Sequence, residues 1–182
     1  MRDVLISGQL MMNVLQLDGR ASFINIAVTI NSKEGGNIIL NIEAIKQMAH
    51  ELLECQHIEN DFIEYKKSDS FSDKILKTAC AYANNFMNRE IGLLFMGVEE
   101  VDDKEHGIKA IPMRPISGIA VEKIENIENR CKKLLANVHP RINYHLISDE
   151  IDGRSYIVLA VEPGSNGPYQ TSDLAEKTKI LD

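Results

Sequence analysis

The sequence has few cysteines and no long apolar run. The three cysteines, Cys55, Cys80 and Cys131, lie far apart and form no CxxC pair. A scattered, odd set of this kind is typical of reduced thiols in a cytoplasmic protein. No run approaches the roughly 18 apolar residues that a membrane span needs, and the N-terminal apolar run is short and broken by Gly8 and Gln9. We therefore predict a cytoplasmic protein without a signal peptide or membrane partner.

Several motifs of known chemistry are missing as well. The five histidines form no HxH or HExxH motif, and no cysteine–histidine set has the spacing of a zinc site. The chain has no GxxxxGK[ST] motif and hence no P-loop. The net charge is -7 and the pI is about 5.3. This acidity argues against a protein that coats nucleic acid through bulk charge, but it leaves a local basic face open.

What is present indicates a folded α/β domain. The chain has 182 residues, of which 44% are apolar, enough for one domain with a sizeable core. Apolar residues at period two predict strands within residues 1–40, as at Ile24, Ile26 and Val28. Further strands are expected at 61–66, 91–98, 141–148 and 155–161, and helical spacing predicts helices at 41–55, from 74 to about 87, and at 120–137.

The connections between these elements complete the prediction. The acidic stretch 99–107 is expected to be a loop, and Asp152-Gly153 is a two-residue hairpin turn. The predicted fold class is α/β (α+β), with a mixed, partly antiparallel sheet covered by helices and an N-terminal β extension. We expect three parts: the β extension at 1–40, the main domain at 41–170, and a tail or linker to an absent module at 171–182.

Four segments occur in an order that resembles a known family. The chain from about 42 to 169 is similar to Schlafen AlbA-like domains, also described as a DNA-binding domain of bacterial transcriptional regulators. These domains have an E-x-x-x-x-E-[FW]-K-x-S strand, a helix with K-x-[IV]-x-A-[FL]-A-N, a G-x-[LI]-x-[IF]-G-V-x-[DE] strand and a late strand followed by a proline loop. The matching segments are "DFIEYKKS", "KILKTACAYANNF", "IGLLFMGVEE" and "VLAVEPGSNGPY". The link "NNFMNREIG" is less glycine-rich than in the family, and Glu99-Glu100 stands where Asp is commoner.

The resemblance implies a nucleic-acid-binding module of a bacterial transcriptional regulator, with DNA or RNA as its partner. Lysines at spacing i, i+3 share one face of a helix and are suited to phosphate contact. The alternative is an ordinary solvated surface. The residues that we expect to bind nucleic acid are Lys66, Lys67, Lys74 and Lys77.

A second reading is a metal-dependent endoribonuclease. By position, Glu59, Glu64 and Glu99 match the three acids that the nuclease branch of the family is described as using. Carboxylates suit Mg²⁺ or Mn²⁺, and such a metal positions water and stabilises charge on phosphate. The same residues are therefore the candidate catalytic and metal-binding set. Acids also commonly fill the exposed ends of strands, so whether the chain is an enzyme stays open, and binding without catalysis is preferred.

A third reading is a protein-interaction or dimerisation domain that binds no nucleic acid, and the acidic net charge keeps it open. We expect a homodimer. A winged-helix or ATPase module commonly follows such domains, so the chain is expected to be a fragment or a short member. Asn84, in "YANN", is expected to bond backbone groups at the end of a helix rather than a ligand.

Overall fold

The computed structural model describes five stretches of the chain, 8–15, 21–28, 42–67, 72–85 and 90–171. Only the backbone is described for the first two stretches and for the first two residues of helix α2. The chain divides into two compact units, Met1–His57 and Ile58–Asp182. Each unit is described by itself.

The described residues of the first unit form two strands and a helix. Strands β1 (Gly8–Leu15) and β2 (Ala21–Val28) pair antiparallel along their full length, which confirms the strands expected from the alternating apolar residues. Helix α1 (Ile42–Glu54) follows. It buries the predicted stripe, whose members are Ile45, Met48, Ala49, Leu52 and Leu53, whereas Ile42 at its first turn is 49% exposed.

The second unit is built on an open sheet of four strands in the order β3-β4-β9-β8. The strands are β3 (Ile63–Lys66), β4 (Gly92–Met96), β8 (Tyr144–Ile151) and β9 (Arg154–Val161). β3 and β4 run parallel, and the other two pairs are antiparallel. The predicted mixed sheet is thereby confirmed. β4 lies between two neighbours and is buried at every residue, as its unbroken apolar run indicates.

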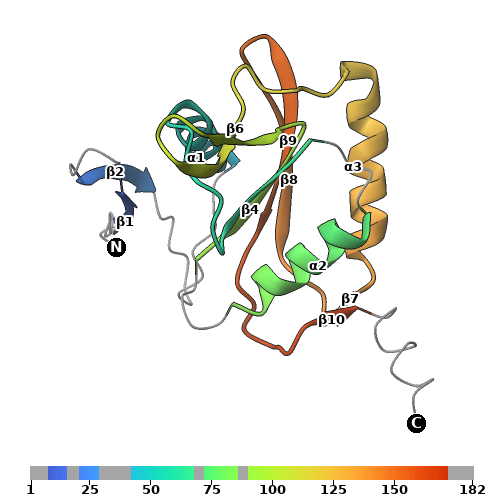
Figure 1. Cartoon of the computed structure of the whole chain (residues 1–182). Coiled ribbons are helices and arrows are strands. Elements are labelled where there is room, and N and C mark those ends of the chain that lie inside the picture. Colours follow the sequence, from blue (N-terminus) through green and yellow to red (C-terminus); the bar gives the residue numbers. More distant parts are fainter. Residues whose placement is uncertain (1–7, 16–20, 29–41, 68–71, 86–89, 172–182) are drawn as a thin grey trace, which may run out of the picture. The chain divides into compact units, whose positions relative to one another are not determined.

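Two helices cover one face of this sheet, α2 (Ser72–Ala83) and α3 (Val121–Leu135) (Figure 1). Both were expected from their apolar stripes. Each aliphatic side chain that these helices bury fully contributes about 2 kcal/mol of transfer free energy. The shared core joins Leu94, Met96, Ile157 and Leu159 of the sheet to Ile75, Ala79, Ile127 and Cys131 of the helices. Phe86 and Met87, also predicted to lie on the stripe, fall outside the described residues. No helix in the described part of the chain is long and apolar enough to cross a membrane.

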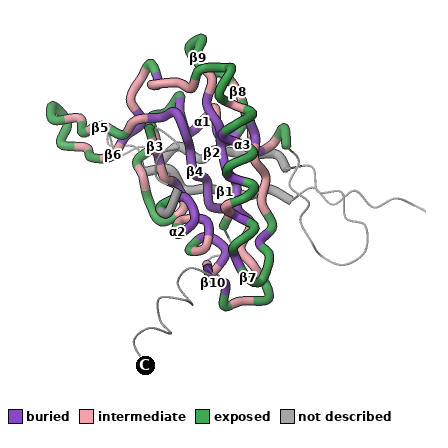
Figure 2. Tube along the Cα trace, turned by 90° about the vertical axis from the view of Figure 1, so that its right-hand side faces the viewer, coloured by how far each residue is buried: buried purple, intermediate pink, exposed green. Residues whose placement is uncertain are grey.

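The stretch predicted to be a loop at 99–107 is instead half of a hairpin. β5 (Glu100–Asp103) pairs antiparallel with β6 (Ile108–Pro112), and Figure 2 shows the tip of this hairpin projecting with exposed and half-buried residues. The loop prediction was wrong because the acids that suggested a loop lie on a strand that is solvated on both sides. At the turn, the Asp103 carboxylate accepts hydrogen bonds from the N–H groups of Glu105 and His106 at 3.0 and 3.2 Å.

The chain after β9 is hydrogen-bonded to the residue that follows α2. The Asn84 amide donates to the carbonyl oxygen of Tyr169 at 2.8 Å, and its own oxygen accepts from the N–H of Tyr169 at 2.7 Å. The predicted structural role of Asn84 is confirmed. Near this contact, two short strands, β7 (Val138–His139) and β10 (Gln170–Thr171), pair antiparallel.

Candidate functional site

Glu64 and Lys66, two charged residues of the segment "DFIEYKKS", lie on β3 at one edge of the sheet. Burial alternates along this strand, with Ile63 and Tyr65 buried and Glu64 and Lys66 half-buried. Glu64 stands opposite Leu94 of β4, and Lys66 stands opposite Met96. Because residues opposite each other on neighbouring strands share a face, both charged side chains lie on the face that α2 and α3 cover.

Glu59 lies just before β3, where one backbone hydrogen bond and the turn at Asn60 fix its position. Its N–H donates to the carbonyl oxygen of Ala110 in β6 at 2.8 Å. The Asn60 side-chain oxygen accepts from the N–H groups of Phe62 and Ile63 at 2.8 and 3.1 Å, which forms the turn into β3. The start of β3 is thus tied to the β5–β6 hairpin, whose first residue is Glu100.

Three carboxyl groups meet at this junction. The side chain of Glu59 lies within hydrogen-bonding reach of those of Glu100 and Glu64. We refer to these three residues as the carboxylate cluster. Burial is the main reason that the pKa of Glu59 rises to about 9, and the two neighbouring carboxyl groups raise it further. Glu59 therefore carries a proton at neutral pH, as expected when like charges share one site.

Of Glu59 and Glu64, Glu64 is the residue whose carboxyl group is ionised. Its burial opposes ionisation, but the hydrogen bond from Glu59 and the contact with Lys66 outweigh burial and lower the pKa of Glu64. Lys74 on α2 adds a weaker attraction to the Glu64 carboxylate. A neutral and a charged carboxyl group therefore stand side by side with cations around them.

Lys66 lies among the three carboxyl groups. Its ammonium group forms an ion pair with the Glu64 carboxylate, and only 13% of its side chain is exposed. Burial acts to lower the pKa of Lys66, but the attraction of Glu64, followed by those of Glu59 and Glu100, raises it overall. Lys66 is consequently a positive charge held beside the carboxylate cluster by its ion pair with Glu64.

Glu99, the third acid expected from the sequence, lies elsewhere. Its carboxylate accepts from the Lys67 ammonium at 2.8 Å and from the Ser117 hydroxyl at 3.3 Å. The hydrogen bond from Lys67 is the main cause that lowers the pKa of Glu99. The structure brings Glu59 and Glu64 together with Glu100 instead. A signal for this was present, because the family pattern G-V-x-[DE] places its acid at position 100 in this chain.

The four lysines expected to bind nucleic acid differ in their exposure. The side chain of Lys67 is 65% exposed, and Lys74 and Lys77 are exposed on α2. Lys66 is the exception because it is half-buried and paired with Glu64. Three of the four therefore have the exposure that a phosphate contact needs.

The carboxylate cluster does not fit a divalent metal in the arrangement that the structure shows. In the part of the chain that the structure describes, no group of three or more His, Cys, Asp or Glu side chains is placed to hold a metal ion. The oxygens of the cluster are turned to a shared proton and to the Lys66 ammonium. Metal ligation requires those same oxygen atoms to be free.

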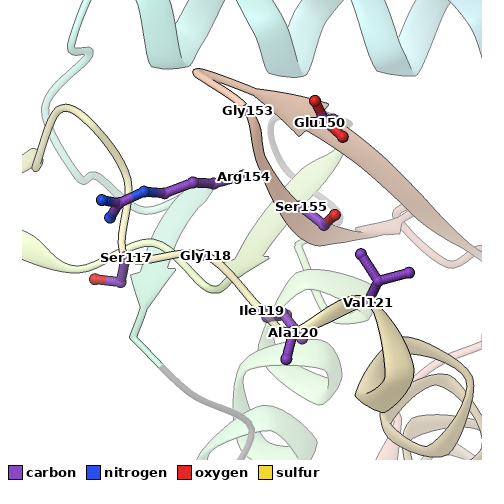
Figure 3. A pocket seen from close by; sticks show the side chains of 9 residues that line it. All are labelled: Ser117, Gly118, Ile119, Ala120, Val121, Glu150, Gly153, Arg154 and Ser155. Atoms are coloured by element: carbon purple, nitrogen blue, oxygen red, sulfur yellow. The ribbon is translucent and has the colours of Figure 1, made fainter.

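A hollow of about 310 Å³ lies away from this cluster, at the start of α3 and the β8–β9 turn (Figure 3). Its lining includes Ser117, Glu150 and Arg154 but none of the three cluster residues. The Arg154 guanidinium is already engaged, because it donates to the carbonyl oxygen of Ile116 at 2.5 Å. The hollow therefore takes no part in the chemistry of the carboxylate cluster.

The fold and the edge cluster together define a class of protein, a mixed α/β domain with an acid- and lysine-bearing edge strand. The sequence profile of the family described as "Schlafen, AlbA_2" matches residues 59–180. The chain belongs to this family. No curated protein sequence gives a match.

A solved structure has a similar fold. It is the solution structure of the N-terminal domain of an "ATP-dependent DNA helicase RecG-related protein" from Nitrosomonas europaea. The two chains are 17% identical, and the superposition covers 69% of this chain and 78% of that one with a TM-score of 0.53. At this level of identity the likeness concerns the fold alone.

Proposed function

We propose that this domain binds nucleic acid through exposed lysines that follow β3 and lie on α2. The observation that carries the proposal is the set of exposed lysines there, namely Lys67, Lys74 and Lys77, on a chain whose net charge is -7. Ammonium groups on such an edge contact phosphates without reading bases. Membership of the Schlafen AlbA_2 family supports this function.

The finer form of the proposal is a binding module of a bacterial transcriptional regulator. In that setting the domain supplies a sequence-tolerant backbone contact in the cytoplasm, and a winged-helix or ATPase module in the longer protein supplies further activity. The exposed lysines support the backbone contact, because ammonium groups are suited to phosphate oxygens.

The proposal is tested by titrating labelled single-stranded RNA, tRNA and duplex DNA with the protein at low and moderate salt. Binding should weaken steeply with salt, with a slope of about -0.9 for each duplex phosphate that is neutralised. Lys67→Glu and Lys74→Glu should each weaken binding to all sequences alike. Lys133→Glu, an exposed lysine on α3, is the matched control and should bind as the wild type does. Equal losses in all three variants, or no binding at low salt, would contradict the proposal.

The nuclease reading stays a prediction, and the same titration with Mn²⁺ tests it. The meeting of Glu59, Glu64 and Glu100 is the observation in its favour, and this reading requires a metal to displace the shared proton and the Lys66 ammonium group. Metal-dependent cleavage that Glu64→Gln abolishes without unfolding the domain would establish it. Glu100→Gln and Glu99→Gln then separate the acid that the structure gathers from the acid that the sequence suggested.

The expected homodimer also stays a prediction, for which β8 is the suitable surface. β8 forms the second edge of the sheet, and β9 is its one ladder partner among the described strands. A second copy that pairs antiparallel about Ile147 places His145 of each copy opposite Asp149 of the other, which is a complementary arrangement. Sedimentation should then show a dimer that Asp149→Lys weakens, whereas a monomer at all concentrations would exclude it.

A further inference from the structure

The position of Lys66 is unusual for a lysine. Lysine side chains are almost never buried unless they are paired, and the Lys66 side chain is only 13% exposed while that of the next residue, Lys67, is 65% exposed. Strand geometry explains the difference, because successive residues point to opposite faces of the sheet. Lys66 shares its face with Glu64, two residues away, and the two form an ion pair.

The surroundings of Lys66 are those of a bound cation. Its ammonium group is paired with the Glu64 carboxylate, and the neighbouring carboxyl groups of Glu59 and Glu100 also raise its pKa. An ammonium group has three N–H donors and no acceptor, so it suits a site made of carboxyl oxygens. A divalent cation in the same place would need the same oxygens and would be repelled by the ammonium charge beside it.

We propose that Lys66 is a built-in cation that holds the carboxylate cluster together and keeps Mg²⁺ and Mn²⁺ out of it. The wild-type cluster is then a metal-free site whose positive charge is supplied by the chain itself. This inference does not rest on nucleic-acid binding, which runs through the exposed lysines. It accounts for a cluster that has the acids of a metal site but not the arrangement of one.

The test measures metal binding in the absence of nucleic acid. The whole chain is titrated with Mn²⁺ by calorimetry for the wild type, for Lys66→Met and for the matched control Lys67→Met. Methionine keeps an unbranched apolar stem and removes the charge. We expect Lys66→Met to bind Mn²⁺ about tenfold or more tightly than the wild type, since one charge in contact with the ligands has been removed. Lys67→Met should bind as the wild type does.

A double variant tests whether the Mn²⁺ that Lys66→Met binds is held by Glu64. Lys66→Met combined with Glu64→Gln should lose the Mn²⁺ binding that Lys66→Met gained, because Glu64 is the partner of the missing ammonium. A folded Lys66→Met protein that gains no Mn²⁺ binding would overturn the proposal. So would a wild-type protein that binds Mn²⁺ as tightly as the variant.

A measurement on the wild type tests whether Mg²⁺ enters the carboxylate cluster, even if Lys66→Met does not fold. The side-chain carboxyl carbons of Glu59, Glu64 and Glu100 are followed by NMR while Mg²⁺ is added to millimolar concentration. Signals that stay in place support a cation site already filled by Lys66. Signals of all three residues that shift together and saturate would show that a metal enters the cluster, which would refute the proposal.

Discussion

Replacing Glu59 with glutamine should stabilise the protein at neutral pH. In the folded state the pKa of this carboxyl group is raised to about 9, whereas its ordinary value is 4.5. Below pH 4.5 the group is protonated in both states and contributes no pH dependence. As the pH rises from 4.5 towards 9, the unfolded chain releases the proton while the folded protein retains it, so the folded state loses stability progressively.

The size of the effect follows from that difference in pKa. Each pKa unit corresponds to about 1.4 kcal/mol, and neutral pH lies about 2.5 units above the ordinary value, which sets an upper bound of about 3 kcal/mol. Glu59 is half-buried, and the water that reaches it screens its interactions. The expected gain for Glu59→Gln at neutral pH is therefore about 1 kcal/mol. Glutamine retains an N–H donor for the Glu64 carboxylate and cannot ionise.

The assay is urea unfolding of both proteins at about pH 5, 7 and 9. The advantage of Glu59→Gln should be small at the lowest pH and grow towards the highest. Glu99→Gln is the control with the opposite sign, because contact with Lys67 lowers the pKa of Glu99 and its removal should cost stability above that pKa. An advantage of Glu59→Gln that is the same at every pH, or one that falls as the pH rises, would refute the reasoning.

Three further substitutions test the fold that positions the cluster, each by urea unfolding. Gly92→Ala should destabilise by about 3 kcal/mol, because the added Cβ would lie 2.0 Å from Cγ of the Tyr82 ring. Asn84→Ala removes both hydrogen bonds to the backbone of Tyr169 and should cost about 2 kcal/mol. Gly153→Val places a branched residue at φ +67° in the β8–β9 turn and should cost about 1–2 kcal/mol. A variant whose urea midpoint equals that of the wild type would contradict the structural reason given for it.

Much of the fold could be predicted because the sequence carries it in local periodicity. The apolar run of β4, the stripes of α2 and α3 and the Asp152-Gly153 turn each depend on residues close together in the chain. The β5–β6 hairpin was missed for the converse reason. Its strands are largely solvated, so no apolar alternation marks them, and acidic residues suggested a loop.

The site was only partly predictable. Glu59 and Glu64 are brought together by the short turn at Asn60, which the sequence suggests. The choice between Glu99 and Glu100 depends on Gly97, whose φ of +89° turns the chain after β4, so that the alternation of β4 does not continue into the acids. The burial of Lys66 is likewise a property of the folded sheet that no local pattern reports.

The carboxylate cluster is assembled from one continuous stretch of chain, residues 59–100. The bend at Asn60, strand β3, the crossover through α2 and strand β4 lie within this stretch, and β5 begins at its end. Closing the loop from Glu59 or Glu64 to Glu100 is tolerable because the entropy of loop closure grows only slowly with loop length. All the acids and lysines of the edge thus leave the ribosome before the β8–β9 hairpin is made. The later half of the domain adds β8, β9 and α3 to the sheet and core, so the stretch that carries the edge charges is made before the elements that complete its support.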